Sequence, residues 1–435
     1  MTSDDCHTII GDIEKFDEKK TELVEPSDEI EYPEGGVTAW LALLGSFLAQ
    51  FTSFGYLNSF GVYEDYYVRT YLPNYTASQI SWIGSTQLFI VLSMSMLSGR
   101  AFDAGYFYHV IIAGSLLFSF SLFMLSLTQP GQFAPIFLAH GIANSIAIGL
   151  IYTPSLAVVS QYFRRRRAWT MGISAAGSAV GGTLHPIMLN QLFHNGENGF
   201  KIGTRASAGM NLCVLLIAVL LMKPRWPPKK QDNNLLTNVK VFLREPAYVF
   251  TGLGTAPALL GMYFPLTFLQ LYAVKRGINP QLAFYSLAIL NGSSAFGRII
   301  PNLVVHKFGN LNVLIVCVMS SVIMIFSMLA VNSTAGIVIF CVIYGFLVGA
   351  YVGLLGPLFA NLAKNQSEIG ARIGICFAFT GIGGLVGNPI AGALLSSSYD
   401  WWKAILFAGL AVSLAAASFT TARHFLSKER GTMIV

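Results

Sequence analysis

Residues 336–359 read GIVIFCVIYGFLVGAYVGLLGPLF and contain no charged side chain. A helix needs about 20 predominantly apolar residues to cross the hydrocarbon core of a bilayer, so this stretch predicts a transmembrane helix. Similar stretches recur along the chain, and we expect an all-α membrane protein with twelve transmembrane helices. The expected spans are near 37–60, 80–98, 107–127, 135–158, 168–190, 206–222, 247–271, 282–303, 311–331, 336–359, 371–395 and 403–422.

The composition supports a membrane protein. Of the 435 residues, 54% are hydrophobic and only 11% are charged, and the mean hydropathy is +0.59. A typical soluble domain carries about 25% charged residues. The net charge of +6 does not indicate nucleic-acid binding, because the basic residues are spread over short loops without interleaved aromatic residues.

The charges in the loops predict how the chain crosses the membrane. If the N-terminus lies in the cytoplasm, the loops on that side hold 21 of the 27 Lys and Arg residues, and the opposite side holds six. Cytoplasmic loops carry an excess of Lys and Arg. We therefore expect a multi-pass protein of the plasma membrane with both termini in the cytoplasm.

Changes in composition along the chain predict five segments. The first 36 residues hold 12 of the 21 acidic residues, which indicates a disordered tail. They do not resemble a signal peptide, because their start is acidic and the following apolar run is long enough to span. The segments are an acidic cytoplasmic tail (1–36), a six-helix bundle (37–222), a cytoplasmic linker (223–246), a second six-helix bundle (247–422) and a cytoplasmic C-terminal tail (423–435).

Internal repetition indicates that the two bundles are related. Spans 5 and 11 each carry two glycines four residues apart, Gly177 with Gly181 and Gly383 with Gly387. This spacing lets two helices approach closely. Two related bundles joined by a linker favour a protein that rocks around a cavity near the bilayer midplane.

Two motifs give the chain a family resemblance. Pro33-Glu34-Gly35-Gly36 lies before span 1, and Tyr162-Phe163-Arg164-Arg165-Arg166-Arg167 lies before span 5. With Gly99-x-x-x-Asp103 after span 2, they resemble the motifs of major facilitator superfamily transporters, and within that superfamily those of the monocarboxylate porter family and its fungal members. The resemblance extends over nearly all of Tyr32 to Ala422. It implies two pseudo-symmetric six-helix bundles that work as a monomer.

The sequence also departs from that family. Animal proton-coupled monocarboxylate carriers have a lysine late in helix 1 and an aspartate one turn before an arginine in helix 8. Here Asn58 takes the place of the lysine and Ser294 takes the place of the aspartate, whereas the arginine is kept as Arg298. His306 replaces the aspartate of the second-half loop motif. The resemblance therefore does not imply simple proton symport of a lactate-like substrate.

The candidate gating residues are Gly99, Asp103, Gly105, Arg164 and Arg167. Asp103 lies in a tight loop, where a carboxylate can bond the N-terminus of a neighbouring helix or an arginine and brace one conformation. An ordinary solvated loop carboxylate is the alternative. Arg164 and Arg167 either anchor the membrane surface or form a gating ion pair.

Ionisable residues inside membrane spans are costly and usually functional. Here they are Arg298, His185 and His140. The planar guanidinium of Arg298 could hold a carboxylate or an enolate, although snorkelling to the interface or bracing a helix is the alternative. His185 could couple transport to protons or bond substrate, or it could bond a helix backbone. We expect His140 to be structural.

Neutral polar residues complete the predicted cavity, and each could contact substrate or join two helices through a hydrogen bond. They are Asn58, Asn144, Tyr152, Tyr263, Gln270, Asn291, Tyr351 and Asn388. All nine acidic residues beyond the tail fall in loops or at the ends of expected spans. We therefore expect no carboxylate deep in the membrane.

These features favour secondary active or facilitated transport by alternating access. A cavity with one cation and no carboxylate suits a small organic anion or an amphipathic metabolite. We expect export of an organic acid or secondary metabolite; the alternative is uptake of a monocarboxylate or vitamin-like nutrient. A membrane enzyme is a weaker alternative, because the Walker A, HExxH and GxSxG motifs are absent. A non-transporting nutrient sensor is another, although such proteins usually add long tails.

No catalytic residue, metal site or cofactor is predicted. The five cysteines form no CxxC pair, and four lie in apolar stretches, which is typical of small buried hydrophobic residues. The sequons at Asn74 and Asn332 fall in predicted outer loops and are candidate glycosylation sites. The expected partners are a small-molecule substrate and the lipid bilayer, and not nucleic acid.

Overall fold

Helices make up the regular structure of the part of the chain that the structure describes. The computed structural model describes residues 32–196, 198–225, 241–363, 368–395 and 400–435. The chain divides into two units, Met1–Pro33 and Glu34–Val435, and all helices named below belong to the second unit. The predicted acidic tail, up to residue 31, and most of the predicted linker lie outside the described residues.

The first half of the chain contains α2 (Val37–Thr52), α3 (Phe54–Leu57), α4 (Phe60–Tyr66), the π-helix η1 (Tyr67–Tyr71), α5 (Ala77–Asp103), α6 (Phe107–Leu125), α7 (Phe133–Ile136), the π-helix η2 (Phe137–Ala143), α8 (Asn144–Ser160), α9 (Arg167–Phe193) and α10 (Gly199–Leu221). The second half contains α12 (Pro246–Lys275), α13 (Pro280–Phe308), α14 (Asn310–Ser327), the 3₁₀ helix η3 (Met328–Ala330), α15 (Thr334–Leu362), α16 (Ile369–Leu395) and α17 (Trp401–Arg430).

Within the described residues, ten helical stretches are long and apolar enough to cross a bilayer. Helices α9 and α13 have the length, with 27 and 29 residues, but Gly, Ser, His, Asn and Arg residues interrupt their apolar runs. These two and the ten together correspond to the twelve predicted spans. Large apolar side chains remain exposed on the helices, with Leu220 84% and Ile323 69% exposed, as contact with lipid requires.

Three helix boundaries differ clearly from the expected spans. The first span continues to Tyr71, the sixth begins at Gly199, and the last continues to Arg430. A hydropathy pattern marks only the apolar part of a helix, and polar residues can extend the helix beyond the hydrocarbon core. Consequently most of the predicted C-terminal tail is helical, and Glu64 and Asp65 lie in α4 rather than in a loop.

Local sequence signals fix several helix ends. The side chains of Thr76 and Gln79 bond each other's backbone N–H groups at 3.2 and 2.9 Å, which is a capping box at the start of α5. Asn279 accepts a hydrogen bond from the backbone N–H of Gln281 at 2.8 Å and so caps α13. Gly105, with a φ of 87°, turns the chain after α5.

Within each half, glycines bring equivalent helices together. A Cβ atom at Gly181 of α9 would lie 2.9 Å from the Cα of Gly55 in α3. A Cβ atom at Gly383 of α16 would lie 2.8 Å from the carbonyl carbon of Ala256 in α12. Both separations are too short for a side chain, so the predicted close approach at these glycines is confirmed. The first and fifth spans of each half therefore pack in the same way, which supports two related bundles.

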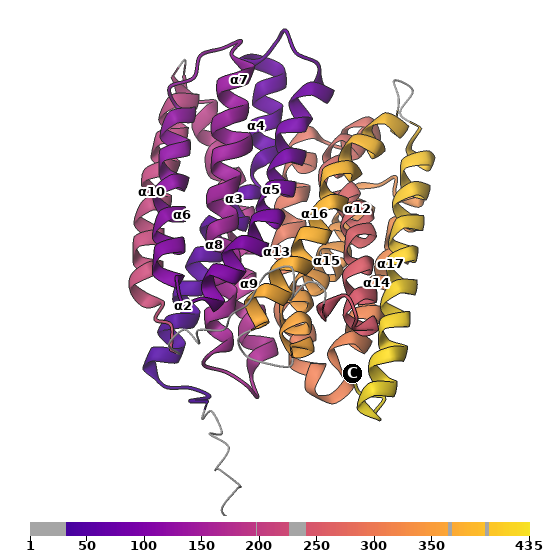
Figure 1. Ribbon diagram of the computed structural model, residues 1–435. Helices are drawn as coiled ribbons and strands as arrows, with labels where there is room; N and C mark the ends of the chain where they lie inside the picture. Colours follow the sequence, from indigo (N-terminus) through magenta and orange to yellow (C-terminus); the bar gives the residue numbers. More distant parts are fainter. Residues whose placement is uncertain (1–31, 197, 226–240, 364–367, 396–399) are drawn as a thin grey trace, which may run out of the picture. The chain divides into compact units, whose positions relative to one another are not determined.

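Two pairs of antiparallel helices make the most extensive contacts between the halves. Helix α5 lies against α16, and α9 lies against α13 (Figure 1). We call the end of the molecule where α5 ends and where α9, α12 and α16 begin the linker end. The opposite end, where α9 ends at Phe193, is the far end.

Candidate functional site

Arg298 of α13 reaches across the junction between the halves. Its Nη1 atom donates to the carbonyl oxygen of Ala175 in α9 at 2.7 Å and to the hydroxyl of Ser178. The residue is only 4% exposed, and no ion pair among the described residues includes it. These contacts match the bracing alternative. A buried cation held only by neutral groups is nevertheless costly, so anion binding stays a prediction.

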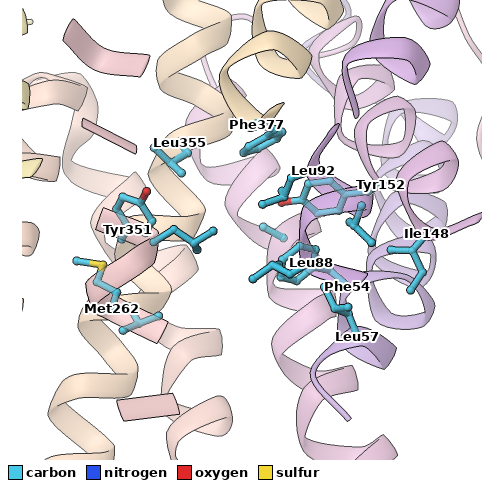
Figure 2. Close-up of a cluster of buried hydrophobic side chains, with 14 of the residues drawn as sticks. Phe54, Leu57, Leu88, Leu92, Ile148, Tyr152, Met262, Tyr351, Leu355 and Phe377 are labelled. Atoms are coloured by element: carbon cyan, nitrogen blue, oxygen red, sulfur yellow. The ribbon is translucent and has the colours of Figure 1, made fainter. Parts of the chain in front are cut away.

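Tyrosines from both halves surround this arginine. Tyr152 of α8 and Tyr263 of α12 lie close enough to Arg298 to interact with its charge. The ring of Tyr152 packs against Phe377 of α16 with 5.4 Å between centroids, and Figure 2 shows these two side chains next to each other. Tyr351, also labelled in Figure 2, donates its hydroxyl to a backbone carbonyl of α12 at 3.2 Å. The structure thus brings four predicted site residues to one level of the junction.

Two predicted asparagines meet at a glycine farther along α9. Asn291 of α13 donates to the carbonyl oxygen of Gly182 at 3.1 Å. A Cβ atom at Gly182 would lie 2.9 Å from Nδ2 of Asn58 and 3.3 Å from Cγ of Asn291. Asn58 is half-buried at the end of α3. The absence of a side chain at Gly182 therefore makes room for one carboxamide from each half.

A pocket lies between the halves at the far end. Its empty space, including solvent at its mouth, is about 580 Å³. It is lined by Gly61, Val62, Asp65, Tyr66, Pro186, Ile187, Asn190, Phe193, His194, Gln270, Phe284, Leu287 and Ala288. Of the residues predicted from the sequence, the lining includes Gln270. The other polar lining residues were missed because nothing in the sequence distinguishes the pocket face of α9 from its other faces.

The halves touch closely at the linker end. A Cβ atom at Gly370 of α16 would lie 2.5 Å from the carbonyl oxygen of Gly99 in α5. Next to this contact, the carboxylate of Asp103 accepts hydrogen bonds from the backbone N–H groups of Gly370 at 3.2 Å and Ala371 at 2.8 Å. A carboxylate is stabilised at a helix N-terminus. Asp103 therefore caps a helix of the other half, and the linker end is closed.

Glu34 falls within the segment predicted as the acidic tail. Its carboxylate accepts hydrogen bonds from the backbone N–H groups of Arg164 at 2.8 Å and Arg165 at 2.6 Å. These residues lead into α9, so Glu34 stabilises the approach to that helix. Arg167 is buried, and its Nε atom lies 3.4 Å from the carbonyl oxygen of Phe163. The signal that could have identified Glu34 is its place in one of the two motifs.

Arg372 of α16, which is not among the predicted site residues, is a buried cation in an ion pair. Its side chain is 1% exposed and makes two hydrogen bonds to the carboxylate of Glu245, at 2.6 and 3.0 Å, and one to Glu368 at 3.1 Å. Its guanidinium also lies over the ring of Phe242, 4.2 Å from the centroid. The ion pair holds the start of α12 to the start of α16 within the second half.

The two histidines inside the spans are packed within the first half. Nε2 of His185 lies 3.2 Å from the carbonyl oxygen of Phe51. A carbonyl only accepts, so Nε2 carries the hydrogen, as in the backbone-bonded alternative. The Nδ1 atom of His185 is buried and makes no hydrogen bond. His140 is also buried, with its Nδ1 atom 3.1 Å from the hydroxyl of Tyr67.

Asn144 and Asn388 join helices in this structure. Asn144 accepts a hydrogen bond from Gln87 at 3.2 Å and donates one to Ser121 at 3.0 Å, which connects α8 with α5 and α6. Asn388 accepts a hydrogen bond from Thr267 at 3.2 Å and connects α16 with α12. Both residues have the geometry of the helix-joining alternative, and a substrate contact stays a prediction.

The described residues contain no group of three or more His, Cys, Asp or Glu that could hold a metal ion. The sequon asparagines Asn74 and Asn332 are exposed at the far end, Asn74 in a turn and Asn332 in the loop between η3 and α15. Their placement on the same end is compatible with the predicted outer loops, and the modification itself stays a prediction.

Sequence comparisons identify related proteins over most of the chain. A family model described as the Major Facilitator Superfamily matches residues 38–367. The aspyridones efflux protein apdF of Emericella nidulans is 38% identical over 365 residues, which is 84% of this chain and 73% of that protein. The agnestins efflux protein AgnL12 of Paecilomyces divaricatus is 34% identical and covers 88% of this chain and 87% of its own length. MFS-type transporter 1 of Ophiocordyceps sp. is 35% identical and covers 92% and 88%.

Solved structures share the arrangement of the helices. A fucose:proton symporter of E. coli aligns with a TM-score of 0.68 and covers 88% of this chain and 98% of its own. The nucleoside transporter NupG aligns with a TM-score of 0.63 and covers 88% and 99%. Their identities to this chain are 14% and 15%, so the similarity concerns the fold alone.

Proposed function

This chain belongs to the Major Facilitator Superfamily, and from that premise we propose that it is an efflux carrier for an amphipathic organic acid or secondary metabolite. It is a multi-pass membrane transporter. Two relatives that resemble it over most of their length are named as efflux proteins for aspyridones and agnestins, which supports export of a metabolite of this general kind.

The observation that carries the proposal is the difference between the two ends of the junction. At the linker end, Asp103 caps α16 and Gly99 contacts Gly370. At the far end, the same two halves leave a pocket that is lined by residues of both halves and opens to solvent. Alternating access requires one end to be closed while the other is accessible, and two bundles that rock against each other satisfy this requirement. This structure corresponds to the state in which substrate leaves toward the far end.

Arg298 is the proposed anchor for an acidic substrate group. In the state with a closed linker end, its guanidinium bonds Ala175 and Ser178 of the opposite half. Opening the linker end separates α9 from α13 and leaves the cation without these neutral partners. A carboxylate or enolate of the substrate then replaces them as a better partner, because hydrogen bonds between charged groups are stronger than those to neutral acceptors.

Transport by the purified protein in liposomes tests this proposal. We expect nucleotide-independent movement of the carboxylated probe anthraquinone-2-carboxylate, and a loss of about tenfold or more in the Arg298→Gln variant. Arg298→Lys, which keeps the charge, should retain more activity. Equal transport by wild type and Arg298→Gln would contradict the anchor. Comparing metabolites inside and outside cells with and without the gene then gives the natural substrate and the direction.

Finer assignments belong to the same proposal. We propose the monocarboxylate-porter branch on the motifs that contain Glu34 and Arg164, and a plasma-membrane location with the linker end in the cytoplasm on the basis of the loop charges. We also propose a monomer without enzymatic activity, glycosylated at Asn74 and Asn332. A shift in gel mobility after glycosidase treatment, reduced in the Asn74→Gln variant and lost when Asn332→Gln is added, tests both the modification and the orientation of these loops.

A further inference from the structure

We propose that the far-end pocket is a second substrate position, which holds the uncharged aromatic part of the exported molecule through its hydroxyl and carbonyl groups. The inference rests on the proposed function and adds a release site to it. The pocket is separate from the level of Arg298. Phe284 and Ala288 precede Arg298 by 14 and 10 residues in α13, and at 1.5 Å per residue they lie about 21 and 15 Å away along the helix.

The charges around the pocket are already satisfied. Asp65 is the one Asp, Glu, Lys or Arg residue of the lining, and its carboxylate pairs with Arg69 at 2.7 Å. The Nδ1 atom of His194 lies 2.8 Å from the backbone carbonyl of Asn190, so it donates to its own helix. No unpaired formal charge among the described residues therefore faces the pocket, which favours an uncharged ligand group.

Two carboxamides, one from each half, line the pocket and make no side-chain hydrogen bonds to described residues. Asn190 comes from α9 of the first half, and Gln270 comes from α12 of the second half; both line the pocket. A carboxamide donates through its NH₂ group and accepts through its oxygen. The pair can therefore bond both carbonyl and hydroxyl groups of one ligand without any change of protonation.

Aromatic and aliphatic side chains supply the rest of the lining. Tyr66 and Phe193 pack with 5.2 Å between ring centroids, and Phe284 and Leu287 lie on the opposite half. Pockets for small organic ligands typically have mostly apolar walls and a few polar groups that fix orientation. The lining of the far-end pocket has this composition.

The position of the pocket also indicates when in the transport cycle it can hold a ligand. Helices α4 and α9 of one half and α12 and α13 of the other form its walls. When these halves approach each other at the far end, the walls close and the site is lost. An occupant can therefore bind only while the far end is accessible, as expected for a position that an exported molecule passes through before release.

Binding of 1,8-dihydroxyanthraquinone to the purified full-length protein, measured by equilibrium dialysis, tests the site. This probe carries hydroxyl and carbonyl groups but no carboxylate. We expect Asn190→Leu and Gln270→Leu each to weaken binding about three- to tenfold, since each removes one or two neutral hydrogen bonds. Ala288→Trp should abolish binding by filling the pocket.

Gln129→Leu is the matched control, because Gln129 is an exposed amide at the same end that does not line the pocket; its affinity should equal that of wild type. Melting temperatures verify that each variant is folded, and if Ala288→Trp does not fold, the two leucine variants still decide the outcome. Wild-type affinity in both leucine variants, or no binding by wild type at the solubility limit of the probe, overturns the inference.

The transport assay separates this inference from the proposed function. If wild type moves neither anthraquinone while the leucine variants lose binding, the carrier function fails and the pocket site stands. If transport depends on Arg298 while both leucine variants bind like wild type, the carrier function stands and the pocket site fails.

Discussion

Replacing Asp103 with asparagine should weaken the closure of the linker end. Asp103 accepts hydrogen bonds of 2.8 and 3.2 Å from the first residues of α16, and asparagine keeps the size of the side chain but loses its charge. Hydrogen bonds to a charged group contribute about 1.5–3 kcal/mol, and the helix dipole adds about 0.3–1 kcal/mol. Because Asp103 is partly exposed, solvent screening reduces the expected loss to about 1–2 kcal/mol.

This loss corresponds to a five- to thirtyfold increase in the population with an open linker end, since about 1.4 kcal/mol is a factor of ten. Thr153 is a suitable reporter. It is fully buried, its hydroxyl makes no hydrogen bond, and its methyl group lies 3.3 Å from the position of a Cβ atom at Gly99. Because Gly99 in turn contacts Gly370 of the other half, we expect a cysteine at this position to become accessible when the linker end opens.

The assay compares the rates at which a water-soluble maleimide labels Thr153→Cys in a background without the five native cysteines. The reagent is kept dilute, so that the rate is proportional to the open population. We expect Asp103→Asn to raise the rate five- to thirtyfold. Asp400→Asn, which removes a carboxylate paired with Lys403 at 2.7 Å at the far end, should leave it unchanged. A rate within twofold of wild type in Asp103→Asn would refute the role of this carboxylate in holding the linker end closed.

Three further predictions follow from contacts within and between the halves. Gly172→Leu should reduce transport more than it reduces the melting temperature, because a Cβ atom there would lie 3.0 Å from the side chain of Asn302 in the other half. Gly297→Leu is the comparison within one half and should mainly lower the melting temperature. A Cβ atom at Gly297 would lie 2.8 Å from the carbonyl carbon of Phe346 and 3.0 Å from the backbone nitrogen of Ala350 of the same half. Arg372→Gln should destabilise the protein by about 1.5–3 kcal/mol, because it removes charged hydrogen bonds between a buried guanidinium and the partly buried carboxylates of Glu245 and Glu368. Adding Glu245→Gln should restore part of the melting temperature; no recovery would argue against the ion pair. Asn144→Leu should cost about 1 kcal/mol, typical of hydrogen bonds between membrane helices, with an unchanged KM in liposome transport, whereas a raised KM would make Asn144 a substrate contact.

The helical fold could be predicted from the sequence because the constraint that a bilayer imposes acts on consecutive residues. Every span must satisfy its backbone internally and present apolar side chains to lipid, and both requirements are visible in consecutive residues such as 336–359. Short-range signals add precision. The glycine pairs in α9 and α16 predicted close helix packing, and the structure confirms that contact.

The candidate site was harder to predict, because it depends on which face of each helix points to the junction. His185 and Asn190 illustrate this. They are five residues apart in α9, which is a rotation of about 140° around the helix. His185 consequently bonds the backbone of the first half, whereas Asn190 lines the pocket. Both are polar residues in one span, and the sequence carries no signal that separates them.

Contacts between residues that are distant in the sequence could not be predicted from it either. Glu34 bonds the backbone near Arg164, and Glu245 pairs with Arg372. In both cases a single carboxylate acts over more than a hundred residues of chain, and neither its hydropathy nor its neighbours in the sequence identify its partner.

The sequence by itself determined that this protein crosses the membrane repeatedly, in two related sets of helices with a basic linker between them. Hydropathy and loop charge are local properties of the sequence, and they decide directly which segments insert into the bilayer. Only the tertiary structure decided that the linker end is closed by Asp103 and Gly99 and that a pocket remains at the far end. That difference arises from the packing of α5 on α16 and of α9 on α13, in which residues nearly 270 positions apart are brought within hydrogen-bond distance.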